Sequence, residues 1–419
     1  MCEEESLEFA DTWAEKVLQL KQVLDMRHGV MLVGPCGTGK STALQTLFKA
    51  LARMDGSKGE YHVIDPKSIA KEKLYGSLDP NTLEWTDGIF TKVLRKAIET
   101  TNSNIRVAPK RCWIIFDGDA DPDWAENLNS VLDDNKILTL PSGDRLKIPD
   151  NVRIIMEVDT LKHATLATVS RCGMIWFARD TVSDEVALLH HIKALGKKPL
   201  EAYISSDGLS PGSSVAQKEV QSKFIDAISV HFTSSPGLVR TALDFAMTQQ
   251  HIMEPSVGRL LGTLDSFIVQ GVLTVLEYNE NNSTFPMADA HLEQFAKRWL
   301  MYSLLWSFGG SLSADRRIAL GRLIMDHSPF SSYEKGKGSK SGGEALSLID
   351  LYVNVNDGDW AEWISLVPKI EIESHKVTSS DVVISTTDTV RHTEILRAWL
   401  TSHKPLLLCG PPGSGITHY

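Results

Sequence analysis

The amino-acid sequence predicts an α/β fold, in which a five-stranded parallel sheet lies between two layers of helices and an α-helical subdomain follows. Three observations support this prediction. A glycine-rich loop joins an apolar run at residues 29–33 to a helix-compatible segment at 42–49. Short apolar runs then alternate with helical periodicity as far as residue 180, which is typical of a parallel sheet. Beyond residue 180 the strand signals fade and helical periodicity takes over.

The loop at residues 34–41 reads Gly-Pro-Cys-Gly-Thr-Gly-Lys-Ser and completes the pattern of a phosphate-binding loop. Its glycines allow positive φ angles, so that backbone N–H groups turn inward and form an anion site with the N-terminus of the next helix. In this pattern Lys40 binds the β and γ phosphates and the Ser41 hydroxyl binds Mg²⁺. The chain is expected to bind a nucleoside triphosphate, or to descend from one that did. The predicted binding residues of the loop are Gly34, Pro35, Cys36, Gly37, Thr38, Gly39, Lys40, Ser41 and Thr42.

The other elements of the α/β part follow in chain order. Apolar residues recur at helical spacing over residues 7–24, with Asp11 as the expected N-cap. Glycines at 56 and 59 end the helix that follows the loop. Further strands are expected at residues 61–64, 113–116, 152–156 and 174–177, a turn-rich segment at 74–85, a helix at 88–98, and a hairpin at 138–146 that turns at 142–143.

The strand at 113–116 is a continuous apolar run, as expected of a parallel strand buried on both faces, and it ends in Asp117. Ligands of open α/β sheets bind at the carboxyl ends of the strands, so Asp117 is expected to hold Mg²⁺ beside Ser41, directly or through water. A hydrolytic site also needs a carboxylate that activates water, commonly the next residue, but here that residue is Gly118. Asp119 follows, and its placement depends on whether the chain turns. Losing such a group lowers the hydrolysis rate by ~10²–10⁴-fold. We therefore expect the chain to retain nucleotide binding even where hydrolysis is lost.

Length and composition narrow the class of protein. The 419 residues predict two to three domains, and a net charge of −10 argues against a nucleic-acid binder, which needs a basic surface to displace counterions. Five cysteines without a C-x-x-C pair indicate neither a disulfide framework nor a zinc site. No uninterrupted apolar run approaches the ~18–20 residues that span a bilayer, and the acidic start is not a signal peptide. We therefore expect an intracellular protein with no nucleic-acid or membrane partner.

Apolar residues beyond residue 180 form helical stripes that are typical of a core. One stripe holds Leu260, Leu264, Phe267 or Ile268, and Val275, and another holds Phe295, Trp299, Tyr302 and Trp306. Residues 331–343 predict a mobile loop, residues 347–355 and 377–384 are β-prone, and residues 390–400 are helix-like. The predicted division is a large α/β subdomain at 1–180, a helical subdomain at 181–328, a flexible loop at 329–345, and at 346–419 a connector with the start of another module.

The segment at residues 405–417 repeats the opening pattern. Its apolar run leads to Gly-Pro-Pro-Gly-Ser-Gly-Ile-Thr at 410–417, but Ile416 stands where the phosphate-binding lysine is required. The sequence stops at Tyr419, before a helix could follow the loop. A loop with neither lysine nor helix dipole has little hold on phosphate, so we expect no nucleotide there. Tandem copies of one module explain the repeat.

Five segments together are specific enough to indicate a family. They are Ile-Phe-Asp-Gly-Asp at 115–119, Glu-Asn-Leu-Asn-Ser-Val-Leu-Asp-Asp-Asn-Lys at 126–136, Ala-Thr-Val-Ser-Arg-Cys-Gly at 167–173, Leu-Tyr-Gly at 74–76 and Glu-Trp-Thr-Asp-Gly at 84–88. They resemble the second AAA+ module of cytoplasmic dynein heavy chains, and the resemblance covers nearly the whole chain. Residues 379–415 resemble the start of the third module, which ordinarily carries the lysine that is absent at Ile416.

The resemblance implies an AAA+ P-loop NTPase core that binds ATP or ADP with Mg²⁺, within a cytoplasmic motor on microtubules. AAA+ modules hydrolyse ATP at subunit boundaries, where an arginine of the next module completes the site. Arg171 matches that arginine finger and would serve the preceding module. Asp159 aligns with the first sensor, where its charge would repel the γ-phosphate. Arg240 is a candidate second sensor from the helical subdomain.

The implied partners are neighbouring AAA+ modules of the same chain, a second heavy chain and accessory chains through regions outside this sequence, and microtubules through a stalk that is absent here. Two enzymatic alternatives stay open. A self-sufficient ATPase of the unfoldase type is opposed by Gly118, by Asp159 and by the missing partner arginine. A P-loop kinase for a small molecule is opposed because no cluster of lid arginines is evident in the sequence.

Overall fold

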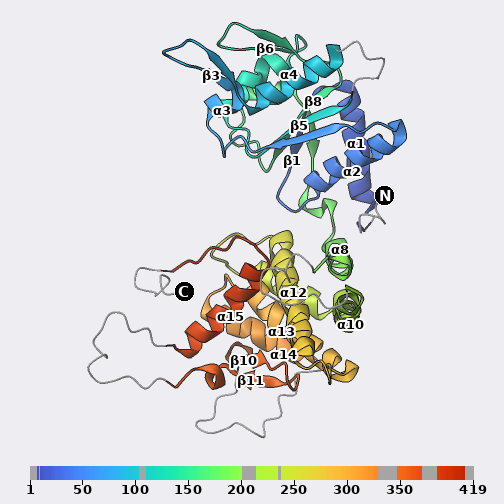
Figure 1. Ribbon diagram of the computed structural model, residues 1–419, viewed down its shortest axis with the longest axis vertical. Helices are drawn as coiled ribbons and strands as arrows, with labels where there is room; N and C mark the ends of the chain where they lie inside the picture. Colours follow the sequence, from blue (N-terminus) through green and yellow to red (C-terminus); the bar gives the residue numbers. More distant parts are fainter. Residues whose placement is uncertain are drawn as a thin grey trace, which may run out of the picture. The chain divides into compact units, whose positions relative to one another are not determined.

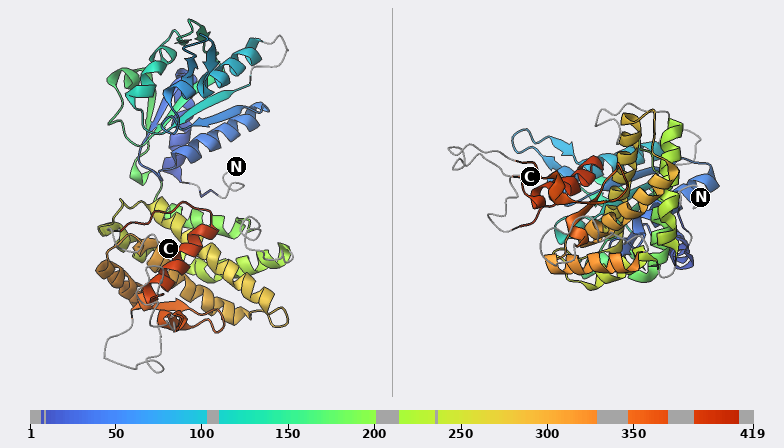
Figure 2. Two further views of the ribbon diagram at one scale, coloured as in Figure 1. Left: turned by 60° about the vertical axis from the view of Figure 1, so that its left-hand side comes forward. Right: turned by 90° about the horizontal axis from the view of Figure 1, so that it is seen from below.

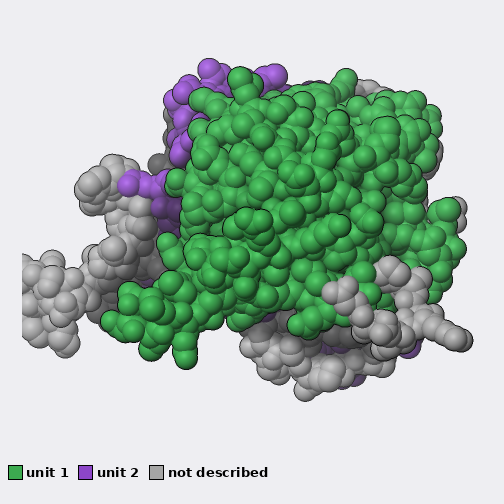
Figure 3. All heavy atoms as spheres, turned by 90° about the horizontal axis from the view of Figure 1, so that it is seen from above, with its two compact units in different colours: residues 1–186 green, residues 187–419 purple. Residues whose placement is uncertain are grey.

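The structure, a computed structural model, describes residues 7–8, 10–102, 110–200, 214–234, 237–328, 347–369 and 385–410. It forms two compact units, residues 1–186 and 187–419 (Figure 3). The first unit contains the phosphate-binding loop and the parallel sheet, and the second is mainly helical. The finer division into four parts stays a prediction.

A five-stranded parallel sheet forms the centre of the first unit (Figure 1). Its strands are β1 (Gly29–Val33), β2 (Glu60–Ile64), β5 (Cys112–Asp117), β8 (Val152–Val158) and β9 (Gly173–Trp176). Their order across the sheet is β2-β5-β8-β1-β9, and every neighbouring pair is parallel. The predicted fold class is confirmed, and the carboxyl ends of β1, β5 and β8 meet at one edge of the sheet.

Helices cover both faces of the sheet (Figure 2). On one face α4 (Ile89–Asn102) contributes Phe90 to a core that contains Ile114 of β5. On the other, α1 (Asp11–Met26) and α2 (Lys40–Asp55) contribute Leu20 and Leu44 to a core that contains Ile115. Because side chains of a strand alternate between its faces, consecutive residues of β5 enter different cores. The predicted three-layer arrangement follows from this alternation.

Two short antiparallel hairpins leave the sheet. The pair β6 (Ile137–Thr139) and β7 (Arg145–Lys147) confirms the predicted hairpin, and Gly143 in its turn has a φ of 90°. The pair β3 (Gly76–Leu78) and β4 (Trp85–Asp87) lies where the sequence predicts only turns. Short helices complete the connections: α3 (Lys71–Tyr75), α5 (Pro122–Ala125), α6 (Asn129–Leu132) and α7 (Leu166–Arg171).

Long helices pack around a core of their own in the second unit (Figure 1). They are α10 (Ser214–Thr233), α11 (Leu238–Thr248), α12 (Val257–Asn281), α13 (Asp289–Gly309), α14 (Ala314–His327) and α15 (Thr387–Thr401), preceded by α8 (Asp184–Lys197). A small hairpin, β10 (Leu351–Val353) with β11 (Trp360–Glu362), packs beside α13. The two predicted core stripes are confirmed, because their members are buried except for the half-buried Trp299.

Some predictions about this chain need correction. α1 begins at Asp11, so Ala10 rather than Asp11 is its N-cap. Residues 404–410 form no strand, although their apolar run resembles that of β1, because no described strand pairs with them and Leu407 is exposed. The predicted mobile loop at 331–343, the β-prone segment at 377–384 and the second loop from residue 411 onward lie outside the described residues.

One described helix, α12, is long and apolar enough by composition to cross a membrane. The sequence contains no uninterrupted apolar run here, because residues such as Asp265 interrupt the apolar stretch. Burial explains its composition, since 61% of the apolar window lies inside the structure and Leu264 and Phe267 are core residues. A single helix of this kind is weak evidence for a membrane span.

Stability should fall in mildly acidic solution because burial lowers the pKa of His28 from its ordinary value of 6.5. The folded state then binds fewer protons than the unfolded state, so this contribution is complete above about pH 6.5 and is lost as the pH falls through the lowered pKa. His28→Gln keeps a nitrogen donor for the Val131 carbonyl, 2.8 Å from the His28 ring nitrogen, but cannot titrate. Thermal unfolding at pH 7.5 and 5.5 should show a smaller acid loss in this variant, and equal losses would contradict the prediction.

Candidate functional site

The predicted phosphate-binding loop runs from the end of β1 into α2, and two of its glycines are required by geometry. Gly34 has a φ of 154°, and a Cβ atom there would lie 2.0 Å from the Phe177 carbonyl oxygen. Gly39 has a φ of 86°, and its Cβ would lie 2.7 Å from the Trp13 indole nitrogen. That nitrogen donates to the Gly39 carbonyl at 3.1 Å. The glycines therefore let β9 and α1 close tightly on the loop.

Lys40 and Ser41, the first residues of α2, have polar partners within the site. The buried Lys40 ammonium donates to the carbonyls of Gly34 and Pro35, so the lysine already lies along the loop that it would use to hold phosphate. The Ser41 hydroxyl donates to the Glu157 carboxylate at 2.5 Å. The two groups expected to meet phosphate and metal therefore lie beside the carboxyl end of β8.

Glu157 is a site residue that the sequence analysis missed. It pairs in register with Asp117 across β5 and β8. Ile115 of β5 and Ile155 of β8 belong to the core beneath α1 and α2, so alternation places Asp117 and Glu157 on that same face. The available signal was a single carboxylate within the apolar strand sequence Val-Arg-Ile-Ile-Met-Glu-Val.

The environment of Glu157 disfavours its charged form. Burial raises the pKa of this carboxyl group, the hydrogen bond from Ser41 opposes the rise, and the charge of the neighbouring Asp117 adds to it. Glu157 is 9% exposed, whereas Asp117 at the strand end is exposed. A cation beside Glu157 would favour its charged form.

The chain turns at Gly118, which settles where Asp119 lies. Gly118 has a φ of 145°, and its N–H donates to the Glu157 carbonyl at 3.1 Å. Asp119 forms an ion pair with Lys67 at 2.8 Å, and this lysine holds the pKa of the Asp119 carboxyl below its usual range. A carboxylate that prefers its charged form and is paired with an ammonium group is a weak general base.

Asp159 and Arg240 lie in different units. Asp159 is exposed and follows Val158, whose carbonyl accepts the Gly34 N–H at 3.1 Å, so Asp159 lies next to the start of the loop. Arg240 belongs to α11 in the second unit, where its Nε donates to Asp244 at 2.9 Å. The structure therefore brings Asp159 close to the predicted site within one unit and gives Arg240 a partner on its own helix.

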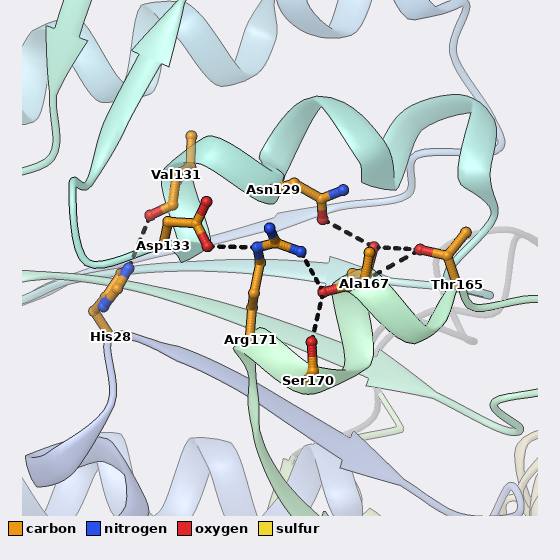
Figure 4. A network of polar contacts seen from close by, with 9 residues as sticks. His28, Asn129, Val131, Asp133, Thr165, Ala167, Ser170 and Arg171 are labelled. Carbon is orange, nitrogen blue, oxygen red and sulfur yellow. Dashed lines mark hydrogen bonds and ion pairs between the residues drawn. The ribbon is translucent and has the colours of Figure 1, made fainter.

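Arg171 is the last residue of α7, and it lies at the opposite edge of the sheet from the loop. Gly173, two residues later, pairs with Val30 near the start of β1, whereas the loop follows the end of β1 at Val33. The Arg171 guanidinium lies between the Asp133 carboxylate and the Ala167 carbonyl, and its Nη1 donates to that carbonyl at 2.7 Å (Figure 4). Arg171 is therefore held in place far from the loop of its own unit.

The α7 helix that carries Arg171 is itself fixed to α6. Thr165 caps α7 by accepting the Thr168 N–H, and the Thr168 hydroxyl donates to Asn129 at 3.0 Å (Figure 4). Asp133, the partner of Arg171, directly follows α6. Two polar contacts thus join these short helices and set the position of the arginine.

The residues around the loop fit a nucleotide with Mg²⁺. Ser41, Asp117 and Glu157 supply hard oxygen atoms, which Mg²⁺ prefers, and the loop supplies N–H groups and an ammonium for phosphate. Among the described residues there is no group of three or more His, Cys, Asp or Glu side chains that could hold a metal ion.

Three family models match this sequence. Residues 29–172 match the AAA domain of the dynein-related subfamily, and residues 229–365 match the dynein heavy chain AAA lid domain. Residues 1–41 match a model described as the hydrolytic ATP binding site of the dynein motor region. The first match contains β1 to α7 of the α/β unit, and the second lies in the helical unit.

Curated relatives match along nearly all of this sequence. The cytoplasmic dynein heavy chain of Drosophila melanogaster is 47% identical over 417 residues, which cover 97% of this chain and 9% of the relative. Those of Caenorhabditis elegans and Dictyostelium discoideum are 42% and 39% identical, covering 100% and 97% of this chain and 9% of each relative. The chain thus spans about a tenth of the length of the relatives it matches.

Proposed function

Because the chain belongs to the dynein heavy chain family, as an AAA module of the dynein motor with an ATP-binding site, we propose that it binds ATP with Mg²⁺ mainly in a structural and regulatory role. The observation that carries the proposal is the loop at residues 34–42, with Lys40 and Ser41 beside the carboxylates at the ends of β5 and β8. ADP would occupy the same loop.

The chain's own residues account for binding. The loop N–H groups and the start of α2 offer partial positive charge to phosphate, and Lys40 adds a full charge. Lys40 would exchange its carbonyl partners for phosphate oxygens, and Ser41 and Asp117 would hold the metal ion. When bound, Mg²⁺ would neutralise the negative charge of the phosphates, which would otherwise be repelled by the carboxylates of the site. Asp159 and Arg240 remain proposed contacts near the γ-phosphate.

Slow hydrolysis is supported by the backbone at Gly118. A general base at this position would need a side chain where φ is 145°, a value that side chains other than glycine rarely adopt. Asp119 is paired with Lys67 and therefore does not replace the general base that is missing at residue 118. Asp159, as the proposed first sensor, would add negative charge near the γ-phosphate rather than an amide that orients water.

We propose that Arg171 acts as a finger on the preceding module. Its position at the amino edge of the sheet, opposite the loop, supports action across a module boundary rather than within its own unit. The contacts with Asp133 and Ala167 fix its Nε and Nη1, which preserves the orientation that a bidentate contact with phosphate oxygens requires.

The wider role rests on the family. We propose that this module works within a dynein motor that moves toward microtubule minus ends in the cytoplasm. Its direct partners would be the adjoining AAA+ modules of the same heavy chain. A second heavy chain, accessory chains and the microtubule would bind through regions outside this sequence.

One observation favours the alternative of an ATPase that completes its own site. The family model for a hydrolytic ATP binding site matches residues 1–41 and so includes the loop as far as Ser41. That match stops before Asp117 and Gly118, which decide whether water is activated. Binding without rapid turnover therefore remains the better supported proposal.

The nucleotide content of the purified chain tests the proposal. After incubation with ATP and Mg²⁺, denaturation and chromatography should release ATP rather than ADP, because the missing base lowers turnover by ~10²–10⁴. Asp119→Asn should leave this result unchanged. Gly118→Glu should not restore turnover, since the glutamate would have to adopt the strained backbone. Rapid ADP formation that disappears in Asp119→Asn would identify Asp119 as the base and refute the proposed slow hydrolysis.

A further inference from the structure

Glu157 is a buried carboxylate that the proposed binding residues do not yet explain. It is 9% exposed, and within the described part of the chain it forms no ion pair with a lysine or arginine, although the Lys40 charge lies close enough to favour its charged form. Burying a carboxylate without a directly paired cation is costly, and such groups in proteins are normally paired or bound to a metal. Its hydrogen-bond partner is the Ser41 hydroxyl, the group expected to bind Mg²⁺. A buried acid therefore lies where a metal would enter.

The sheet register places a second carboxylate beside it. Asp117 and Glu157 are paired residues on neighbouring parallel strands and lie on the face covered by α2, whose second residue is Ser41. Two carboxylates and a hydroxyl from three elements thus converge at one edge of the sheet. This arrangement matches the oxygen donors that hold Mg²⁺ on phosphates.

Resting on the ATP-binding function proposed above, we propose that Glu157 is a positioning residue of the Mg²⁺ site. With ATP and Mg²⁺ bound, the Ser41 hydroxyl would be free to hold the metal ion, and the Glu157 carboxylate would keep Ser41 in position and add negative charge beside the metal. Without nucleotide, Glu157 holds Ser41 in place. The charge of Glu157 therefore favours the metal–nucleotide complex and disfavours nucleotide alone, because a carboxylate repels phosphate that Mg²⁺ does not neutralise.

The test is the affinity of the purified chain for ATP, measured by equilibrium dialysis in excess Mg²⁺ and again in EDTA. Glu157→Gln keeps an oxygen acceptor for Ser41 and removes the charge. The ratio is the ATP affinity in Mg²⁺ divided by the ATP affinity in EDTA. In Glu157→Gln it should fall about tenfold or more, as is typical for the loss of groups that orient metal ligands. ATP affinity in EDTA should stay equal or rise. The same change at Glu60, at the amino end of β2, is the matched control and should leave the ratio unchanged.

Two outcomes distinguish a failure of the Glu157 proposal from a failure of the proposed ATP binding. If Glu157→Gln binds ATP with the ratio of the parent chain, the role of Glu157 is refuted while ATP binding stands. If the parent chain binds no ATP under either condition, both proposals fail. Glu157→Asp keeps the charge on a shorter side chain and should lower the ratio by less than Glu157→Gln. Should Glu157→Gln not fold, Glu157→Ala removes the same charge, and an unchanged ratio in that variant would equally overturn the proposal.

Discussion

Arg171→Ala in a full-length dynein heavy chain should slow ATP turnover by ~10³–10⁵-fold, if the preceding module supplies most of that turnover. The arginine would stabilise charge that develops on the γ-phosphate of its neighbour, and alanine offers no replacement. ATP binding to the loop at residues 34–42 should not change, because Arg171 lies at the opposite edge of the sheet. Turnover is measured by phosphate release, and binding to this loop by nucleotide content.

Two further variants make the result specific to a finger. Arg171→Lys keeps the charge but loses the planar fork, so it should rescue little of the rate. Arg145→Ala removes an exposed arginine on β7 of the same unit and should leave turnover normal. If Arg171→Ala retained normal turnover and lost nucleotide from its own loop instead, the assignment of Arg171 to the preceding module would have to be withdrawn.

Lys40→Ala should weaken ATP binding by about 100-fold or more, since charged hydrogen bonds contribute ~1.5–3 kcal/mol each and Lys40 would reach two phosphates. Equilibrium binding of ATP with Mg²⁺ measures the loss. In the structure Lys40 is 6% exposed and lies along the loop, so its ammonium needs little rearrangement to meet phosphate.

The exposed Lys58, in the connection between α2 and β2, provides a control of equal charge, and Lys58→Ala should bind ATP like the parent. Thermal unfolding of both variants shows whether the fold is retained. Equal ATP retention by Lys40→Ala and the parent would mean that the loop does not bind phosphate.

Patterns local to one segment made the sheet and the loop predictable. The apolar run that ends in Asp117 and the glycine spacing at residues 34–39 each identify their element without distant information. Glu157 could not be placed in the same way, because its partners Ser41 and Asp117 are distant in sequence and meet only through strand register. The hairpin of β3 and β4 escaped prediction because its short strands lie in a segment rich in turn-forming residues, with Gly76, Asp79 and Pro80 close together.

The segment at residues 404–410 shows the limit of local composition. Its apolar run has the composition of β1, but a strand exists through its neighbours, and β1 has β8 and β9 on either side. Within the described residues the later run has no such neighbours, and its leucines at 407 and 408 are exposed. Local composition predicts a tendency toward extended structure, and tertiary pairing decides whether a strand forms.

The backbone at Gly118 also limits how this site could change over evolutionary time. A Cβ atom at this position would meet its nearest neighbour, an Asp65 oxygen, at 3.7 Å, so space does not prevent a larger residue. The φ of 145° opposes it, because such strained conformations cost ~1–3 kcal/mol in residues other than glycine. A glutamate there would carry this cost unless the turn after β5 were also rebuilt. On the proposed function, a lineage that acquired this turn would therefore recover hydrolysis less readily through one substitution than through changes that also rebuilt the turn.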